Sequence, residues 1–262
     1  MHMLEVIDKG RCTDAHPVPL LFVHGAWHGA WCWDEHFLDL FADKGYRALA
    51  VNLRAHGGRP SNKALHRLSI ADYTDDVAAV VDGLVLPPIL IGHSLGGFVV
   101  QKYLEAHDGP AGVLIASAPP QGVLPFLVRW LKQRPSRFAR AMVTGNSLYL
   151  LETPELVREK MFSPHTPESD VVRYTGRLQN ESLRTMPGMI FTLPKPDRVS
   201  APMLVLGGGE DNTFTQQEVH ATARAYGSEA EIFPSMGHDI MLEPGWRTVA
   251  EYIDTWLVDQ GL

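Results

Sequence analysis

Short apolar runs alternate with helical periodicity along most of the chain, and this alternation limits the fold more than any other feature. Strand-like runs are predicted at residues 20–23, 47–51, 89–91, 113–116, 203–206 and 230–233. Helical patterns are predicted at residues 37–42, 69–84, 95–106, 216–226 and 246–257. Strands that alternate with helices form βαβ units, in which neighbouring strands run parallel. The sequence therefore predicts an α/β protein built on a mostly parallel sheet that is flanked by helices.

One long segment interrupts the alternation. Residues 119–191 contain no strand-like run but several helical stretches rich in Phe, Trp, Leu and Met. The 262 residues suffice for one large α/β domain, and no internal repeat or linker divides them. We therefore expect a single core domain, residues 1–118 and 192–262, into which residues 119–191 are inserted as a helical unit.

Charge and composition argue against several classes of partner. The formal net charge of −7 disfavours nucleic acid or an anionic membrane, because both bind basic surfaces. The densest basic stretch, residues 129–140, holds five Lys and Arg and is predicted to be a solvated helix face. Cys12 and Cys32 are predicted to be isolated reduced thiols, which form neither a disulfide framework nor a metal site.

The sequence also carries expectations about location. No apolar run approaches the roughly 18–20 residues that a membrane-spanning helix needs. Residues 1–8 lack the basic region and the apolar stretch of a secretory signal. We therefore expect a cytoplasmic protein without a membrane span, whereas the oligomeric state leaves no mark on the sequence.

A serine in a glycine-rich pentapeptide is the strongest candidate for chemistry. Gly92-His93-Ser94-Leu95-Gly96 fits the pattern G-x-S-x-G and lies between a predicted strand and a predicted helix. In that context the pattern predicts a nucleophile elbow, a tight turn that lifts the serine clear of the sheet in a strained backbone conformation. The alternative interpretation is a glycine-rich turn with an ordinary N-cap serine.

A serine hydroxyl needs a base to take its proton, and the base needs a third group that holds its tautomer. His238 follows the last predicted strand, at the edge of the sheet where α/β sites are built. Asp211 follows the preceding strand, one helix and one strand before His238. We predict Ser94 as nucleophile, His238 as base and Asp211 as acid, with Glu210 as the alternative acid. His220 falls within a predicted helix and is expected at the surface.

Two backbone N–H groups are predicted to stabilise the negative oxygen of a tetrahedral intermediate. One belongs to Leu95, the residue after Ser94, and the other to Ala26, in the loop after the strand at residues 20–23. His24 is expected to be a buried, hydrogen-bonded brace for this loop. His28 is expected at the surface or at the edge of a pocket.

With these residues in place, the chain resembles the α/β-hydrolase superfamily over essentially its whole length. Residues 22–33, Phe-Val-His-Gly-Ala-Trp-His-Gly-Ala-Trp-Cys-Trp, are especially similar to the methylesterase and hydroxynitrile-lyase branch. The resemblance implies an eight-stranded, mostly parallel sheet, a helical cap at residues 119–191 and no cofactor. Lyases of that branch carry a lysine beside the catalytic histidine, where this chain has Asp239. Epoxide hydrolases and dehalogenases of the fold use an aspartate nucleophile, where this chain has Ser94.

The function that these features predict is a serine hydrolase, a carboxylesterase that cleaves a small or medium, largely apolar ester through an acyl-enzyme on Ser94. One fold hosts many chemistries. A lactonase, thioesterase, C–C bond hydrolase, hydroxynitrile lyase or perhydrolase, or a non-catalytic ligand receptor, are the alternatives. Apolar residues of the inserted segment are candidates for the substrate pocket, although most of them are expected to form its own core. Substrate contacts are predicted at Trp27, Phe126, Trp130 and Met142.

Overall fold

The computed structural model describes residues 4–58 and 64–262. Its strands are β1 Val6–Gly10, β2 Leu20–Val23, β3 Arg47–Val51, β4 Ile89–His93, β5 Gly112–Ile115, β6 Met203–Gly208 and β7 Ala230–Phe233. Its α-helices are α1 Trp31–Asp34, α2 Phe37–Asp43, α3 Ile70–Val81, α4 Leu95–Leu104, α5 Leu124–Gln133, α6 Pro135–Thr144, α7 Pro154–Met161, α8 Glu168–Thr175, α9 Thr185–Phe191, α10 Gln216–Ala225 and α11 Trp246–Asp259. Short 3-10 helices lie at Leu65–Arg67, Ser147–Leu150, Pro196–Arg198 and Ile240–Leu242. Every predicted strand and core helix is present, with ends that differ by a few residues at most.

The strands form one sheet in the order β1-β3-β2-β4-β5-β6-β7. β1 runs antiparallel to β3, and all the other pairings are parallel. The chain order reverses between β2 and β4, and such a switch point opens a crevice at the carboxyl ends of the two strands. There Val23 pairs with Gly92. This register brings the loop after β2 and the elbow after β4 side by side.

The described residues contain seven strands, one fewer than the resemblance implies. β1 was not predicted because it is a partly exposed edge strand. Its sequence, Val-Ile-Asp-Lys-Gly, has no continuous apolar run. Between β1 and β2, Thr13 and His16 exchange backbone hydrogen bonds of 3.1 and 3.2 Å in a tight turn. Pro17 and Pro19 follow this turn, and neither can donate a hydrogen bond to a neighbouring strand. This connection therefore forms no further strand.

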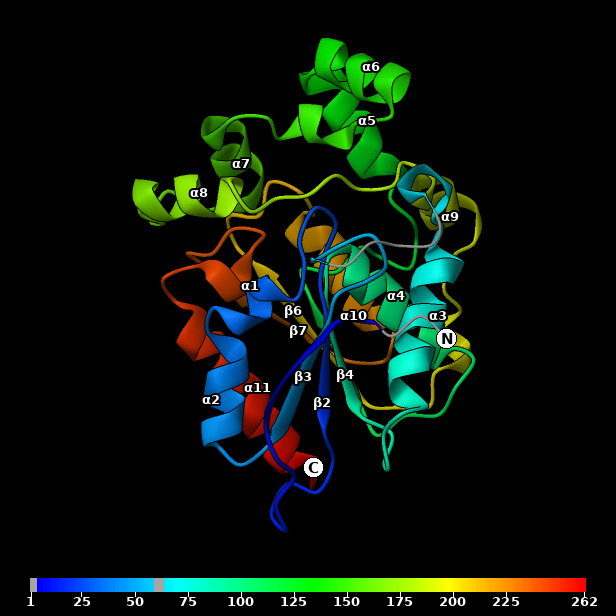
Figure 1. The fold of residues 1–262 in the computed structure, drawn as a ribbon, viewed down its shortest axis with the longest axis vertical. Helices are drawn as coiled ribbons and strands as arrows, with labels where there is room; N and C mark the ends of the chain where they lie inside the picture. The colour runs from blue at the N-terminus through cyan, green and yellow to red at the C-terminus, as the bar shows by residue number, and fades with distance from the viewer. Residues whose placement is uncertain (1–3, 59–63) are drawn as a thin grey trace.

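Helices cover both faces of the sheet, with α2 and α11 on one side and α3 and α4 on the other (Figure 1). α3 begins at a capping box, in which Ser69 accepts from the Asp72 N–H and Asp72 accepts from the Ser69 N–H. Large side chains such as Phe22, Trp33 and Phe98 are fully buried between the layers. Burial of each contributes about 1.5–3 kcal/mol to folding. No helix in the described part of the chain is both long and apolar enough to cross a membrane.

The segment between β5 and β6 folds into α5 to α9, with no strand among its residues 119–191, all of which are described. α5 to α8 lie beyond one end of the sheet, whereas α9 lies beside α3 (Figure 1). That end carries the site, since α5 and α9 line a cavity together with Ser94. Arg173 and Arg177 pair with Glu35 of the core, which ties the α8 end of the segment to α1.

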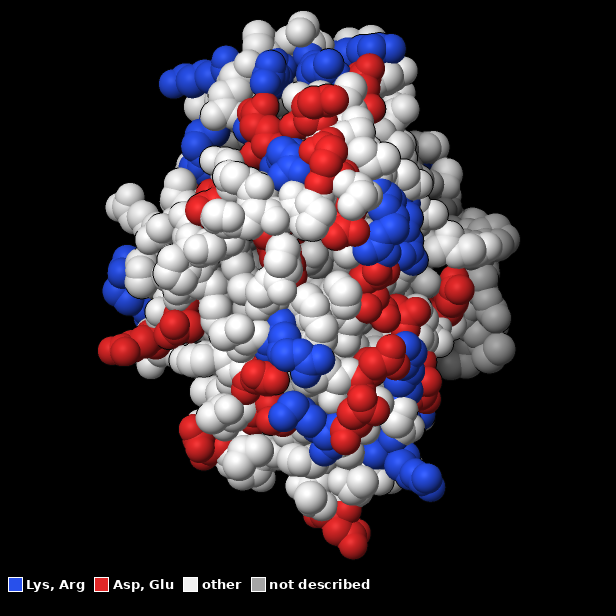
Figure 2. All heavy atoms as spheres, turned by 90° about the vertical axis from the view of Figure 1, so that its left-hand side faces the viewer, with Lys and Arg blue, Asp and Glu red and all other residues white. Residues whose placement is uncertain are grey.

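The basic stretch at residues 129–140 is solvated and ion-paired. Three of its four arginines form pairs of 2.7–2.8 Å, which are Arg129–Glu218, Arg134–Glu159 and Arg137–Glu152. Figure 2 shows positive and negative side chains mixed over the face that it presents. Exposed pairs of this kind contribute about 0–1 kcal/mol each.

Candidate active site

Ser94 stands on a strained turn between β4 and α4. Its φ is +51° and its ψ is −118°, a conformation that a residue with a side chain rarely adopts and that costs about 1–3 kcal/mol. Backbone hydrogen bonds hold it in place, because the Ser94 N–H donates to Ile115 (3.1 Å) and the Ser94 carbonyl accepts from Ala118 (3.0 Å). Both partners lie on or just after β5. The pentapeptide therefore forms a strained elbow, and the Ser94 side chain does not cap a backbone N–H group of α4.

The glycines of the pentapeptide leave room for the close approach of neighbouring backbone. A Cβ at Gly92 would lie 2.6 Å from the Gly96 carbonyl oxygen. A Cβ at Gly96 would lie 2.3 Å from the Val23 carbonyl oxygen and 2.4 Å from that of His24. The elbow thus packs directly against the loop after β2.

Replacing Gly96 with alanine is expected to lower the free energy of unfolding by about 1–3 kcal/mol, the usual cost of overpacking. The matched control is Gly176→Ala, because Gly176 has an ordinary φ of −66° and the nearest atom to its added Cβ lies at 3.6 Å. The control should change stability by less than about 0.5 kcal/mol. Urea unfolding of both variants measures the difference, and equal losses would contradict the close packing of the elbow.

Three side chains from three loops form one chain of hydrogen bonds. Ser94 Oγ lies 2.9 Å from His238 Nε2, and His238 Nδ1 lies 2.8 Å from Asp211 Oδ2. The side chains of His238 and Asp211 are 2% and 0% exposed. Because the Asp211 carboxylate only accepts, the His238 proton is on Nδ1, and its Nε2 is free to accept the Ser94 hydroxyl proton.

Asp211 is fixed by its own loop. Its second oxygen, Oδ1, accepts from the backbone N–H groups of Thr213 (2.6 Å) and Phe214 (3.0 Å). The side chain of Glu210, the alternative acid, is 36% exposed and lies 3.8 Å from His165 Nε2. The structure therefore brings Asp211, and not Glu210, to His238.

The loop after β2 makes a tight turn beside Ser94. The His28 N–H donates to the Gly25 carbonyl (3.3 Å), and Trp27 within the turn has a φ of +65°. Trp27 is held by its indole N–H, which donates to Ser147 Oγ at 2.9 Å. Ala26 and Leu95 both line the cavity next to Ser94. Their backbone N–H groups stay the predicted donors to an oxyanion.

The histidines near this turn differ in their environments. His24 is fully buried, and its Nε2 accepts from the Leu53 N–H (3.1 Å) while its Nδ1 lies 2.8 Å from the Gly25 carbonyl. Burial holds the pKa of His24 well below 6.5, so the ring is neutral and braces the turn, as predicted. His220 is exposed on α10, as predicted.

The expectation that His28 lies at the surface or at the edge of a pocket is wrong. Its side chain is 1% exposed, and its Nε2 lies 3.0 Å from the Asp239 carboxylate, itself 1% exposed. The sequence could not reveal this, because the two residues are 211 positions apart and no local pattern marks a buried histidine. Asp239 thus faces His28, and its second oxygen lies 3.6 Å from His93 Nε2.

Glu243 is a second buried carboxylate that sequence reasoning missed. Its oxygens accept from the backbone N–H groups of Gly237 (2.9 Å) and Ser163 (2.6 Å) and from the Thr166 hydroxyl (2.7 Å). These bonds join the loop that carries His238 to the segment after α7. Glu243 therefore fixes the loop that carries His238 against the inserted helices.

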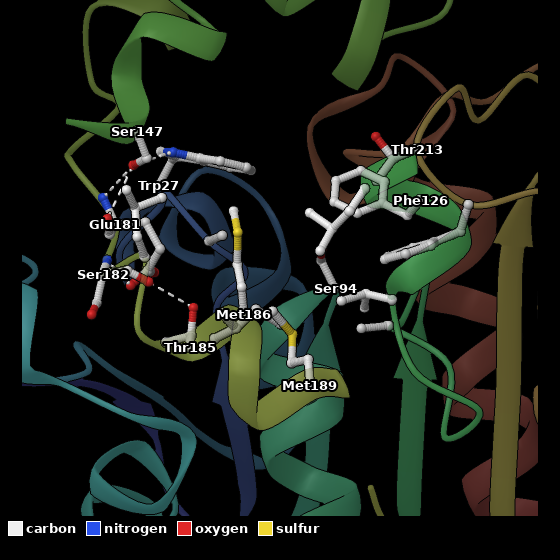
Figure 3. A pocket seen from close by; sticks show the side chains of 17 residues that line it. Trp27, Ser94, Phe126, Ser147, Glu181, Ser182, Thr185, Met186, Met189 and Thr213 are labelled. Atoms are coloured by element: carbon white, nitrogen blue, oxygen red, sulfur yellow. Dashed lines mark hydrogen bonds between the residues drawn. The ribbon is translucent and has the colours of Figure 1, made fainter. Parts of the chain in front are cut away.

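A cavity reaches from the elbow into the inserted segment (Figure 3). Residues that line it include Ala26, Trp27, Ser94, Leu95, Val123, Phe126, Leu127, Ser147, Glu181, Met186, Met189, Thr213 and Phe214. Most of these side chains are apolar, and none of the lining residues in the described part of the chain is Lys or Arg. Met186 and Met189 of α9 belong to the apolar residues of the inserted segment that were candidates for the pocket. Glu181 and Ser147 were not anticipated as lining residues, because nothing local marks which polar side chains of the segment meet the elbow.

Two of the four predicted substrate contacts do not line this cavity. Trp27 and Phe126 do, whereas Trp130 and Met142 do not. Trp130 is buried, but its ring stacks on that of Trp27 with centroids 5.9 Å apart, so that it supports the wall from behind. Met142 is 41% exposed on α6, which lies outside α5 in Figure 1. Helical spacing in the sequence does not distinguish the side chains that line the cavity from those that lie behind them.

One group of side chains has the types and spacing of a metal site. His93, His238 and Asp239 each place a ligand atom within 4.8 Å of the others. One atom of each residue already has a protein partner, however: His93 Nε2 lies 3.1 Å from the His238 carbonyl, His238 Nε2 bonds Ser94, and Asp239 Oδ2 pairs with His28. We therefore assign no metal role to them, and the sequence predicted neither metal nor cofactor.

Comparison with known proteins gives the family. The family model described as the alpha/beta hydrolase family matches residues 20–251. The chain belongs to the alpha/beta hydrolase family. This alpha/beta hydrolase is 24% identical over 238 residues to a monoacylglycerol lipase of Mycolicibacterium smegmatis, which covers 86% of this chain and 82% of the lipase. It is 38% identical over 88 residues to methyl jasmonate esterase 1 of Vitis vinifera, or 32% of this chain and 33% of that enzyme.

The fold of this alpha/beta hydrolase also occurs among solved structures. A thermophilic esterase from Thermogutta terrifontis superposes with a TM-score of 0.78 at 20% identity, and the match covers 99% of this chain and 94% of the esterase. The α/β-hydrolase fold predicted from the sequence is therefore confirmed.

Proposed function

We propose that this alpha/beta hydrolase is a serine carboxylesterase that cleaves small or medium, largely apolar esters. The observation that carries the proposal is the hydrogen-bond chain from Asp211 through His238 to Ser94 at the wall of a mostly apolar cavity. Relatives named as a monoacylglycerol lipase and a methyl jasmonate esterase support an ester as the substrate class.

In the first half-reaction, Ser94 Oγ attacks the carbonyl carbon of the ester while its proton moves to His238 Nε2. The carbonyl oxygen becomes negative, and the N–H groups of Ala26 and Leu95 donate to it. The bond between the carbonyl carbon and the alcohol oxygen then breaks. His238 gives its proton to that oxygen, the alcohol leaves, and the acyl group stays on Ser94.

In the second half-reaction, His238 takes a proton from water as the water oxygen attacks the acyl carbon. The bond to Ser94 Oγ breaks, Ser94 regains a proton from His238, and the carboxylic acid leaves. Asp211 stays ionised throughout and stabilises the imidazolium that forms in each half.

We assign residues 119–191 the role of a cap that sets substrate preference. The segment contributes Val123, Phe126, Leu127, Met186 and Met189 to the cavity. Such side chains favour an apolar acyl or alcohol group, because burial of apolar surface drives binding. Asp239, a carboxylate that lies buried against His28, occupies the sequence position where the similar lyases carry lysine. This arrangement favours hydrolysis over cyanohydrin cleavage.

A p-nitrophenyl ester series from acetate to laurate tests the proposal, together with labelling by a fluorophosphonate probe. We expect turnover of the shorter esters and covalent labelling that depends on Ser94. A protein that is folded but neither turns over any ester nor reacts with the probe would overturn the esterase assignment and favour a non-catalytic receptor.

Phe126 lines the cavity and Met142 does not, so these two predicted contacts offer a matched test of the pocket. Phe126→Ala removes a wall of the cavity and is expected to lower kcat/KM for the longer esters by about tenfold or more, since a buried Phe contributes about 1.5–3 kcal/mol. Met142→Ala alters an exposed side chain outside the cavity and should leave the ratio of long-chain to short-chain kcat/KM unchanged. Because the readout is a ratio between substrates, a general loss of stability does not mimic it. Equal ratios in both variants would contradict the assigned wall.

A further inference from the structure

A buried ion pair lies behind the triad, between two residues that the proposed mechanism does not use. His28 Nε2 is 3.0 Å from Asp239 Oδ2, and both side chains are 1% exposed. His28 ends the turn that holds Ala26, and Asp239 is the neighbour of His238. The pair therefore joins the loop of the predicted oxyanion donor to the loop of the base.

The partners of His28 determine its charge. Its Nδ1 lies 2.8 Å from the Ala26 carbonyl oxygen, and its Nε2 lies 3.0 Å from the Asp239 carboxylate. Both partners only accept hydrogen bonds, so both ring nitrogens must carry a hydrogen and the ring is an imidazolium. Burial lowers the pKa of His28, but the Asp239 carboxylate more than offsets burial and holds this pKa above 6.5.

A second histidine, His93, lies beside the Asp239 end of the pair. His93 Nε2 lies 3.1 Å from the His238 carbonyl oxygen and 3.6 Å from Asp239 Oδ1. Burial, followed by the neighbouring His238, lowers the pKa of His93 to about 3. His93 is therefore neutral, and its Nε2–H group donates a hydrogen bond to the backbone carbonyl of His238.

The bond from His28 to Ala26 acts on a strained turn. Trp27 has a φ of +65°, in a position of the turn that glycine usually occupies. The orientation of the Ala26–Trp27 peptide fixes that φ, and His28 Nδ1 holds this peptide by its carbonyl oxygen. A hydrogen bond from a charged donor is stronger than one from a neutral donor. Loss of the charge on His28 therefore weakens the contact that keeps the turn strained.

We propose that His28 and Asp239 are a positioning pair, in which protonated His28 holds the Ala26 turn in register with the His238 loop. Neither side chain of the pair lines the cavity next to Ser94. The proposal rests on the proposed function, because the register matters only if Ala26 N–H and His238 act on one intermediate. A displacement of about 1 Å at such a site can cost about 10²-fold in rate.

The pair makes the expected activity sensitive to high pH. The folded-state pKa of His28 is raised, so the stabilisation that the pair provides is present below 6.5 and is lost as the pH rises through the raised value. Above that value His28 is neutral and cannot donate to both partners. The rate is therefore expected to fall on the alkaline side as the turn loosens.

Other titratable and charged groups surround the pair on several elements. They are His238 beside Asp239, His93 at the end of β4, His24 in the loop after β2, His56 after β3, Cys32 of α1, and Arg177, whose guanidinium lies 4.2 Å from the Trp31 ring that stacks on His28. His24 and His93 are neutral because burial lowers their pKa values. His56 faces Glu181 at 3.4 Å, and a change at Asp239 leaves that pair in place.

Asp239→Asn tests the pair, with the pH profile of kcat/KM for p-nitrophenyl acetate as the readout. The substitution keeps the shape of the side chain but removes the charge that raises the pKa of His28. We expect the alkaline limb to move to lower pH by about one unit or more, which is the size of effect that one lost charge partner produces. A merely structural residue would lower the rate at every pH without moving the limb.

His28→Gln provides the second arm. Glutamine can still donate to Asp239, but it does not titrate and does not reach the Ala26 carbonyl. We expect the limb to disappear and kcat to fall about tenfold or more, while KM changes by less than about threefold. His220→Gln, an exposed position on α10, is the control and should leave the limb in place. A limb that persists in His28→Gln, or that does not move in Asp239→Asn, overturns the proposal.

A measurement without turnover separates this proposal from the proposed function. In Ser94→Ala protein labelled with ¹⁵N-histidine, the His28 ring should be doubly protonated at pH 7 and should titrate at the pH of the wild-type alkaline limb. A neutral His28 ring at pH 7 overturns the positioning pair even if the enzyme is an esterase. If Asp239→Asn fails to fold, this titration alone decides.

Discussion

Ser94→Ala is expected to lower kcat for p-nitrophenyl ester hydrolysis by about 10⁶-fold, the loss found when a triad nucleophile is removed. The reason is geometric: Ser94 Oγ is the hydroxyl that lies 2.9 Å from the free nitrogen of His238. Without it no acyl-enzyme can form, and only water held by the remaining groups can attack. Steady-state kinetics at saturating ester and fluorophosphonate labelling measure the loss in parallel.

Ser117→Ala is the matched control for this substitution. Ser117 is also a buried serine near the elbow, but its hydroxyl donates to the Ala118 carbonyl at 3.0 Å and accepts from Gln101. We expect its kcat to stay within about tenfold of the wild type, because Gln101 keeps carbonyl acceptors at Gly97 and Ala118. A Ser94→Ala protein that retained more than a tenth of the wild-type rate would remove Ser94 from the mechanism.

Asp211→Asn is expected to lower kcat by about 10⁴-fold, whereas Glu210→Gln should change it by less than about threefold. The carboxylate of Asp211 holds the His238 proton on Nδ1, at 2.8 Å. An amide at this position can turn its NH₂ group toward Nδ1. The proton then resides on Nε2, which can no longer accept from Ser94.

The comparison of neighbouring acids is informative because both substitutions remove one negative charge from the same loop. Only Asp211 is held toward His238, through the backbone N–H groups of Thr213 and Phe214. kcat and the melting temperature of each variant should be measured together, so that a loss of fold is not read as a loss of chemistry. Should Glu210→Gln be the more damaging change, the acid role would move to Glu210.

The order of strands and helices could be predicted from local pattern, because buried parallel strands are nearly continuous apolar runs. β2, β3 and β7 begin and end where the sequence places them. β1 could not be predicted, since its edge position allows Asp8 and Lys9 within the strand. The elbow and the order of Ser94, Asp211 and His238 could also be predicted, because each of these residues follows a recognisable strand in the sequence.

The sequence by itself determined the α/β alternation, the glycine-spaced serine and the loops that end at one edge of the sheet, because each depends on neighbours within a few residues. Only the tertiary structure decided which side chains meet across that edge. It turned His28 inward onto Asp239, set Phe126 on the cavity and left Met142 outside it. The physical reason is that burial and charge depend on partners that the fold brings together, and no spacing along the chain records those partners.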